Sequence, residues 1–181
     1  EDGFFRYATR RDWSEPHYEK MLQDNAGLLR VYAEAYGLLG DAAYAEVARG
    51  VARYLTTTLW QPLVRAFAGS QDADERYYAL DAEGRGASQA PFVDPTVYVD
   101  WNALAAGSLL RAAQLLHEPA LAEPALAALD TLWDGARKRR GMAHYLSPAA
   151  RPAGNGSAVG LRPAGVSGLL GDQALVAAAM L

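Results

Sequence analysis

The sequence predicts an all-α protein built from repeated αα-hairpins, and three observations support this fold class. Apolar residues recur at helical spacing in two pairs of long segments, and glycines or prolines separate these segments. Three similar tripeptides, Asp24-Asn25-Ala26, Trp101-Asn102-Ala103 and Asp172-Gln173-Ala174, open Ala/Leu-rich stretches, and their second residues lie 77 and 71 residues apart. Such a period predicts stacked hairpins, because a single hairpin cannot bury both of its faces.

The first hairpin is predicted over residues 14–62. Its first helix begins near Ser14, with Pro16 in the first turn, unless Asp24 caps a second helix after a short one. A glycine-rich turn follows, and the second helix covers about 42–60. Two antiparallel helices joined by a tight turn form an αα-hairpin.

The second hairpin is predicted over residues 100–140, after an irregular stretch at 66–96. Its helices cover 101–117, with Asp100 as N-cap, and about 121–139. The second helix ends in a basic run, where cations suit the helix dipole.

A third hairpin is expected to start at residues 172–181, after a long loop at 141–172 that is rich in glycine and proline. Asp172 looks like the N-cap of its first helix. Because the helix-forming stretch after Asp172 continues to Leu181 without a C-cap signal, we expect the chain to be a piece of a longer protein.

The two helices of each hairpin differ in character. The first helix is rich in small and apolar residues, as in 103–110, whereas the second helix carries more charged residues, as in 130–140. This contrast is typical of an inner helix that is buried all round and an outer helix with a wet face. We therefore predict that residues 1–181 form part of one (α/α)6 toroid, a partial ring with long irregular loops. Side faces left open in such a piece would favour association into homo-oligomers.

Composition and charge exclude several other classes. Of 181 residues, 51% are apolar and 21% charged, which suits a packed core and excludes a disordered chain. A net charge of −4 argues against nucleic-acid binding. With no cysteine, these residues hold no disulfide, Cys-ligated zinc or CxxC site. No apolar run reaches the roughly 20 residues that span a bilayer. The start of the chain lacks a signal peptide, which favours a cytoplasmic protein.

Several motifs in residues 3–115 resemble one known family. They are Gly3-Phe4-Phe5-Arg6-Tyr7-Ala8-Thr9, Asp12-Trp13, Pro16-His17-Tyr18-Glu19-Lys20-Met21-Leu22, Asp24-Asn25-Ala26, Ser70-Gln71-Asp72-Ala73-Asp74, Tyr77-Tyr78 and Asp100-Trp101-Asn102. Together they are similar to the thioredoxin-domain-containing proteins of the spermatogenesis-associated type. The resemblance implies a thioredoxin-like domain followed by a glycosidase-like six-hairpin toroid, to which this chain contributes part. Expected partners are then the remainder of the toroid and the thioredoxin-like domain, which is absent here.

Four residues are candidates for catalysis. His17 could act as a general base or bind sugar hydroxyls, and Glu19 could act as a general acid at the mouth of the ring. The alternative is that His17 is a cap and Glu19–Lys20 a solvated charge pair. Asp72 and Asp74 could supply the paired carboxyl groups of an inverting glycosidase, and Asp100 is a further carboxylate of interest for the same geometry. The alternative is an Asx-turn for Asp72 and Asp74 and an N-cap for Asp100.

Aromatic and amide side chains complete the predicted substrate-binding set, which is Trp13, Tyr18, Lys20, Asn25, Trp101 and Asn102. Exposed aromatic rings would stack on a sugar, whereas packed rings would close the space between hairpins. Core packing is the alternative for Trp101, and for Tyr18 and Trp13 both interpretations stay open.

No metal or cofactor site is predicted. Asp72-x-Asp74 lacks the glycine and the later ligands of an EF-hand loop, and the three histidines, His17, His117 and His144, are isolated. There is no dinucleotide fingerprint, P-loop or nucleophile elbow. Two functional hypotheses remain. The toroid binds or processes a sugar-like small molecule, or it is a non-catalytic scaffold that supports the thioredoxin-like domain or another protein.

Overall fold

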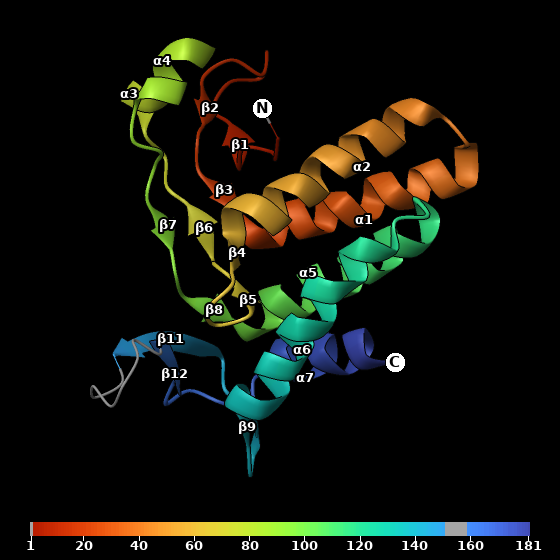
Figure 1. Ribbon diagram of the computed structural model, residues 1–181, viewed down its shortest axis with the longest axis vertical. Coiled ribbons are helices and arrows are strands. Elements are labelled where there is room, and N and C mark those ends of the chain that lie inside the picture. The colour runs from red at the N-terminus through yellow and green to blue at the C-terminus, as the bar shows by residue number, and fades with distance from the viewer. Residues whose placement is uncertain (1, 151–158) are drawn as a thin grey trace.

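The computed structural model describes residues 2–150 and 159–181. Three helices lie side by side, namely α1 (Leu22–Leu39), α5 (Val99–Leu115) and α7 (Leu170–Met180) (Figure 1). Helix α2 (Ala42–Tyr54) packs on α1, and α6 (Ala122–Ala136) packs on α5. The prediction of repeated αα-hairpins with an inner and an outer helix is therefore confirmed.

The first helix begins eight residues later than predicted from Ser14. Residues 14–21 instead hold β2 (Pro16–His17), which pairs with β1 (Tyr7–Ala8), and β3 (Lys20–Met21). Trp13 and Glu15 have positive φ angles of 63° and 56°, which a helix does not allow. Asp24 lies in the first turn of α1, and the N-cap is Met21. Pairing with distant strands thus overrides the local start signals.

The end of the first hairpin agrees better with prediction. Gly40, with a φ of 68°, ends α1, and the side chain of Asp41 caps α2. The π-helical turn η1 (Leu55–Leu59) extends α2 almost to the predicted residue 60. Strands β4 (Trp60–Gln61) and β5 (Ala66–Phe67) then form a small hairpin.

The stretch 66–96, which was expected to be irregular, contains short elements. It begins with β5 and continues with β6 (Ser70–Gln71), α3 (Glu75–Tyr78), α4 (Ala82–Ala87) and β7 (Val93–Asp94). Strand β6 lies between β3 and β7 in a three-stranded sheet. The sequence does not show these pairings, because each strand is two residues long.

The second hairpin differs from prediction at its ends. Helix α5 begins at Val99, after β8 (Val97–Tyr98), so Asp100 lies in the first turn and is not the N-cap. The 3-10 turn η2 (Pro119–Leu121) leads into α6. Helix α6 ends at Ala136, because the basic run that follows enters a β-hairpin of β9 (Arg137–Lys138) and β10 (Gly141–Met142).

The predicted loop at 141–172 also contains strands. After β10, β11 (Tyr145–Ala150) pairs with both β8 and β12 (Val159–Pro163). The part of the predicted loop at 151–158 lies outside the described residues. Helix α7 then begins at Leu170, so Asp172 lies in its first turn and is not the N-cap.

The sequence repeat is matched by a repeated set of hydrogen bonds at the start of each inner helix. The amide of Asn25 accepts from the backbone N–H of Phe4 and donates to the carbonyls of Phe4 and Met21. Asn102 forms the same three bonds with Phe67 and Tyr98. In the third unit, Gln173 accepts from Met142 and donates to Leu169. We call these three side chains the amide clamps.

Strand pairing connects consecutive units in the same way twice. Strand β3 pairs with β6, and β8 pairs with β11, each just before an inner helix. The first N–H of the helix then donates to the next unit, from Leu22 to Gly69 and from Val99 to His144. Helices α1 and α5 therefore each begin at a residue whose backbone N–H is bonded to the following unit.

Most of the core lies between the helices. One buried cluster joins α1, α2, α5 and part of α6, and a second joins α6, α7 and the strands beside them. Many of these residues are alanines, which allow the inner helices to approach closely. Across residues 2–150 and 159–181, no helix has both the length and the apolar character that a bilayer crossing requires.

Candidate functional site

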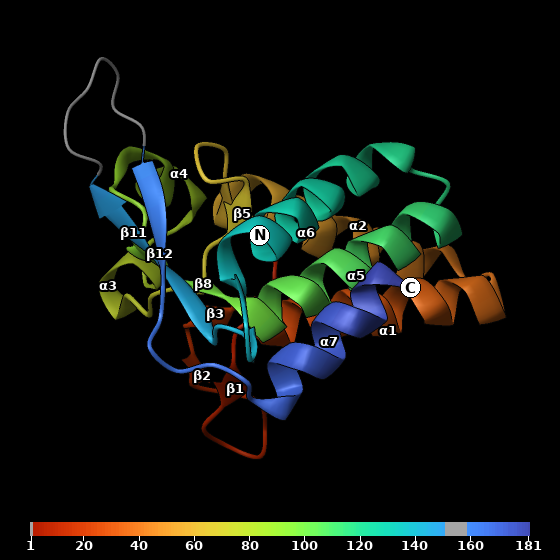
Figure 2. The same ribbon diagram turned by 90° about the horizontal axis from the view of Figure 1, so that it is seen from below.

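The three inner helices begin at the same end of the molecule. Strands and short helices gather at this end, while the opposite end consists of helix–helix turns (Figures 1 and 2). We call the surface formed by the first turns of α1, α5 and α7 and the strands that precede them the mouth end. The positive end of the helix dipole lies here, and it favours the acidic side chains that stand in the first turns, Asp24, Asp100 and Asp172.

At the mouth end, three ionisable side chains from different elements meet. They are Asp100 in the first turn of α5, His144 between β10 and β11, and Asp172 in the first turn of α7. One polar atom from each lies within 4.8 Å of the others. Nδ1 of His144 is 3.2 Å from Oδ1 of Asp172. We call these three residues the acid–base cluster.

Asp172 is the buried member of the acid–base cluster. It is 1% exposed, and its second oxygen, Oδ2, has no hydrogen-bond partner among the described residues. Burial raises the pKa of Asp172, the contact with His144 opposes this, and the nearby charge of Asp100 adds to the increase. A buried carboxyl group with a free oxygen is costly, which is typical of functional sites.

The contact with Asp172 determines the orientation of His144. An ionised carboxylate only accepts hydrogen bonds, so Nδ1 of His144 carries the hydrogen that Asp172 accepts. The other nitrogen, Nε2, then has a free lone pair, and the side chain is 32% exposed. A histidine held this way can accept a proton from a bound molecule.

Aromatic rings surround the acid–base cluster. The ring of Tyr98 lies 4.3 Å from that of Trp101 and 6.2 Å from that of His144, and Tyr145 lies 6.1 Å from both Tyr98 and His144. A Cβ at Gly69 would come within 2.8 Å of the Tyr98 ring, so this glycine allows the ring its position. Burial, and then the charge of Asp94, raise the pKa of Tyr98.

The neighbouring unit provides an internal control for the acid–base cluster. The junction between the first and second units can be aligned with the junction between the second and third units through their amide clamps. In this alignment Gln23, Gly69 and Trp101 occupy the positions of Asp100, His144 and Asp172. The strand pairing and the clamp bonds form at both places. The framework therefore does not require ionisable residues here, which argues that the cluster has a function of its own.

The predicted catalytic residue His17 lies apart from the acid–base cluster. Its ring stacks on Tyr7 at 4.9 Å, and it lines a hollow of about 480 Å³ with Tyr18 and Glu75. Its Nδ1 is buried without a partner among the described residues. Glu19 forms an ion pair with Arg6 at 2.8 Å and does not line this hollow.

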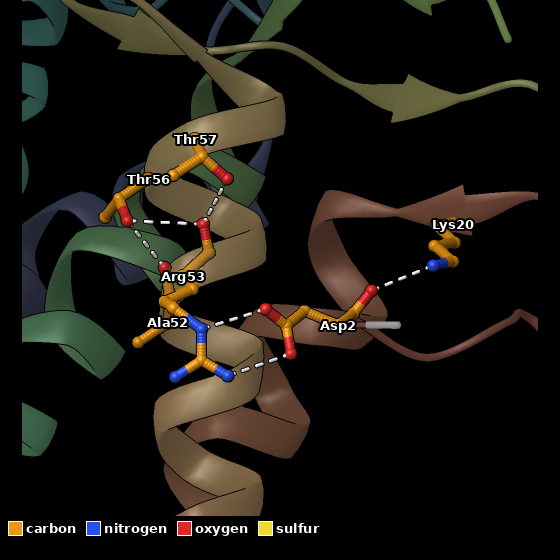
Figure 3. Close-up of polar contacts among 6 residues, drawn as sticks. All are labelled: Asp2, Lys20, Ala52, Arg53, Thr56 and Thr57. Carbon is orange, nitrogen blue, oxygen red and sulfur yellow. Dashed lines mark hydrogen bonds and ion pairs between the residues drawn. The ribbon is translucent and has the colours of Figure 1, made fainter. Parts of the chain in front are cut away.

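Lys20 is not part of a solvated charge pair, and that alternative is wrong. It is 2% exposed, and its Nζ donates to the carbonyl oxygen of Asp2 at 2.8 Å (Figure 3). Three aromatic rings also face its ammonium group, those of Phe5, Tyr54 and Tyr78. The carboxylate of Asp2 binds Arg53 through two hydrogen bonds, so these contacts attach the N-terminal segment to α2.

The paired aspartates lie in a neighbouring hollow of about 560 Å³. Asp74 caps α3 by accepting from the N–H groups of Arg76 and Tyr77, and Asp72 is exposed. Ala73 and Glu75 line both this hollow and that of His17, so the two hollows adjoin. The structure thus brings His17 near the aspartate segment but does not gather all four predicted catalytic residues.

The predicted substrate-binding residues have different environments. Asn25 and Asn102 are fully buried and bonded to backbone, so neither offers surface to a ligand, and the structure gives them a structural role instead. Tyr18 packs between Phe5 and Tyr78. Trp101 is partly buried against Tyr98, and Trp13 is 84% exposed. Ligand contact by either tryptophan remains a prediction.

Sequence reasoning missed the acid–base cluster. The sequence presents His144 as isolated and Asp172 as an N-cap, and it offers Asp100 as a carboxylate of interest whose alternative is an N-cap. The sequence did contain one indication of the cluster. When the tripeptides are aligned, Asp172 precedes the clamp of the third unit, whereas Trp101 precedes the clamp of the second. Only the strand pairing shows that His144 lies beside them.

Asp172→Asn is expected to raise the melting temperature at pH 8. A raised pKa means that the protonated carboxyl group is favoured by folding, so this contribution to stability is lost as the pH rises through the folded-state pKa. Asparagine is neutral throughout, so the gain should be largest at pH 8 and shrink towards pH 4. Thermal unfolding from pH 4 to 8 measures it, with Asp24→Asn as control. A lower melting temperature at pH 8 would contradict the prediction.

Comparison with solved structures defines the class of the fold. A cellobiose 2-epimerase from Spirochaeta thermophila matches with a TM-score of 0.64 and 22% identity over 86% of this chain and 36% of that one. An α-1,6-mannanase from Salegentibacter sp. matches with a TM-score of 0.53 and 13% identity, covering 70% of this chain and 33% of that one. At such identities the likeness concerns the fold alone. The chain is part of a six-hairpin, glycosidase-like (α/α)6 toroid.

Sequence relatives identify the more particular resemblance. Spermatogenesis-associated protein 20 of mouse is 47% identical over 72 residues, and the human protein is 43% identical over the same length. Each match covers 40% of this chain and 9% of the relative. No family model matches the sequence. The resemblance to proteins of the spermatogenesis-associated type is thereby confirmed over part of the chain.

Proposed function

We propose that the toroid to which this chain contributes binds and processes a carbohydrate at its mouth end, with His144 as the group that transfers a proton. The observation that carries the proposal is the 3.2 Å contact between His144 and the buried Asp172. It lies at the starts of two inner helices and beside three aromatic rings. The solved structures with this fold include proteins named as a sugar epimerase and a mannanase.

Each residue has a separate role in this proposal. Nε2 of His144 accepts a proton from the sugar and returns it, while Asp172 orients the ring and stabilises the imidazolium that forms. Asp100 accepts hydrogen bonds from hydroxyl groups. The exposed faces of Tyr98 and Trp101 stack on the sugar ring.

The test uses the full-length protein and a panel of reducing mono- and disaccharides. Calorimetry measures binding, and NMR in D2O measures exchange of carbon-bound hydrogen, with chromatography for hydrolysis or epimerisation. We expect binding of at least one sugar and either exchange or a product. The proposal fails if the panel gives no binding and no turnover.

A second candidate function is a scaffold that supports the thioredoxin-like domain. It is favoured by a groove of about 590 Å³, lined by residues of η1, β4, η2 and α6 that include Trp60, Leu121 and Pro124. Hydrogen exchange would compare the full-length protein with a variant that lacks the thioredoxin-like domain. Increased exchange at 56–65 and 120–127 in the shortened variant supports docking, and unchanged exchange contradicts it.

A further inference from the structure

We propose that the acid–base cluster recognises a positively charged amino group on its substrate, as in an amino sugar, and rejects acidic sugars. This inference rests on the proposed function and specifies its substrate class. It is supported by the charges at the site, by the hydrogen-bonding capacity that remains free, and by the difference between the second and third units.

The acid–base cluster carries two carboxyl groups and one histidine, which contacts Asp172. Among the described residues, no lysine or arginine forms an ion pair with Asp100 or Asp172. Asp94 lies beside Gly69 and Tyr98, so its carboxyl group is near the aromatic ring that contacts His144. In the first unit, Arg6 pairs with Glu19, and the Nζ of Lys20 donates to the carbonyl oxygen of Asp2. A carboxylate or phosphate on a ligand would therefore meet like charge.

Free hydrogen-bond acceptors remain beside these charges. Oδ2 of the buried Asp172 has no partner among the described residues. Oδ1 of Asp100 accepts only from the backbone N–H of Trp101 at 2.9 Å, in the part of the chain that the structure describes. An ammonium group brings three donors and a positive charge, so it can bind both carboxylates and offset their repulsion. A hydroxyl group brings one donor and no charge.

A metal ion is less suited than an ammonium group to this arrangement. Nδ1 is the atom of His144 that faces Asp172, at 3.2 Å, and when Asp172 is ionised this nitrogen donates its hydrogen to the carboxylate. A metal requires the lone pair of a deprotonated nitrogen at that position. The contact with Asp172 would have to be lost for a metal to bind there.

The second unit shows what the same position looks like without this specificity. Gln23, Gly69 and Trp101 replace the three charged or ionisable side chains. Trp101 packs on Tyr98 there, at 4.3 Å. An aromatic surface therefore lies next to the charged cluster, and together they suit the apolar face of a sugar ring and an amino substituent.

The experiment compares sugars of one ring shape on the full-length protein after EDTA treatment. Calorimetry measures the affinity for glucosamine, glucose, N-acetylglucosamine and glucuronate at pH 7. Glucosamine is expected to bind at least about tenfold tighter than glucose, because hydrogen bonds to charged groups are stronger than neutral ones. N-acetylglucosamine, which has the nitrogen without the charge, should lose this advantage, and glucuronate should bind most weakly.

Variants assign the preference to the acid–base cluster. Asp100→Asn is expected to bring the glucosamine-to-glucose affinity ratio close to one. Asp24→Asn, which removes the carboxyl group at the position of the first unit that corresponds to Asp172, should leave that ratio unchanged. Circular dichroism confirms that both variants are folded.

Four results would overturn the inference. Equal or tighter binding of glucuronate contradicts it while leaving the proposed function intact, and so does an affinity ratio that Asp100→Asn does not change. Tight Zn²⁺ binding that Asp172→Asn abolishes would replace it with a metal site. Failure of every sugar to bind would overturn the proposed function and this inference with it.

Discussion

His144→Gln is expected to lower the turnover of a bound sugar by about 10²–10⁴-fold, the usual contribution of a general acid–base group. Glutamine can still donate a hydrogen bond to Asp172, but it cannot accept and return a proton. The melting temperature should change little, because the histidine ring is partly exposed and lies outside the main core. Steady-state kinetics on the full-length protein measures the loss.

The control for this variant is His17→Gln. His17 packs on Tyr7 in a separate hollow, so its replacement should leave turnover within a few-fold of the wild type. If His17→Gln abolished turnover and His144→Gln did not, the proposed site would be wrong. In that case the hollow beside Ala73 and Glu75 would become the better candidate.

Asn102→Ala is expected to destabilise the protein by about 3 kcal/mol or more. The change leaves the N–H and C=O of Phe67 and the C=O of Tyr98 without their side-chain partner, and each unsatisfied buried group costs about 1–3 kcal/mol. The melting temperature should fall as well. Chemical and thermal unfolding of the full-length protein measure both quantities.

The matched control is Gln173→Ala at the corresponding position. Its bonds to Met142 and Leu169 are longer, at 3.2 and 3.4 Å, and lie partly or fully in solvent. The loss should therefore be under about 1 kcal/mol. Equal effects of the two variants would show that the amide clamps do not stabilise through buried hydrogen bonds.

The sequence predicts helices well where apolar periodicity decides them. Helices α1, α2, α5 and α6 overlap the expected segments, because a regular apolar stripe needs only local information. Their starts were misplaced at Ser14 and Asp100, since pairing with strands far along the chain determines them. Two-residue strands carry no recognisable pattern, so neither they nor the starts that depend on them could be predicted.

The candidate site was predicted less well for a related reason. The sequence motifs predict a site at His17 and Glu19, whereas in the structure Glu19 forms an ion pair with Arg6. The catalytic roles predicted for His17, Asp72 and Asp74 remain predictions. His144 and Asp172 lie 28 residues apart in sequence, and a bridge of Ala143 with Ser167, together with the bond from the N–H of His144 to the carbonyl oxygen of Val166, brings the histidine to the start of α7.

The amide clamps have a consequence for how such a ring can diversify. Asn102 holds the backbone, whereas its neighbours Asp100 and Trp101 contribute nothing to the three clamp bonds. Architecture and chemistry are thus assigned to adjacent residues of one helical turn. Mutation can therefore change what a unit recognises without changing how it folds, and each duplicated hairpin can acquire its own specificity.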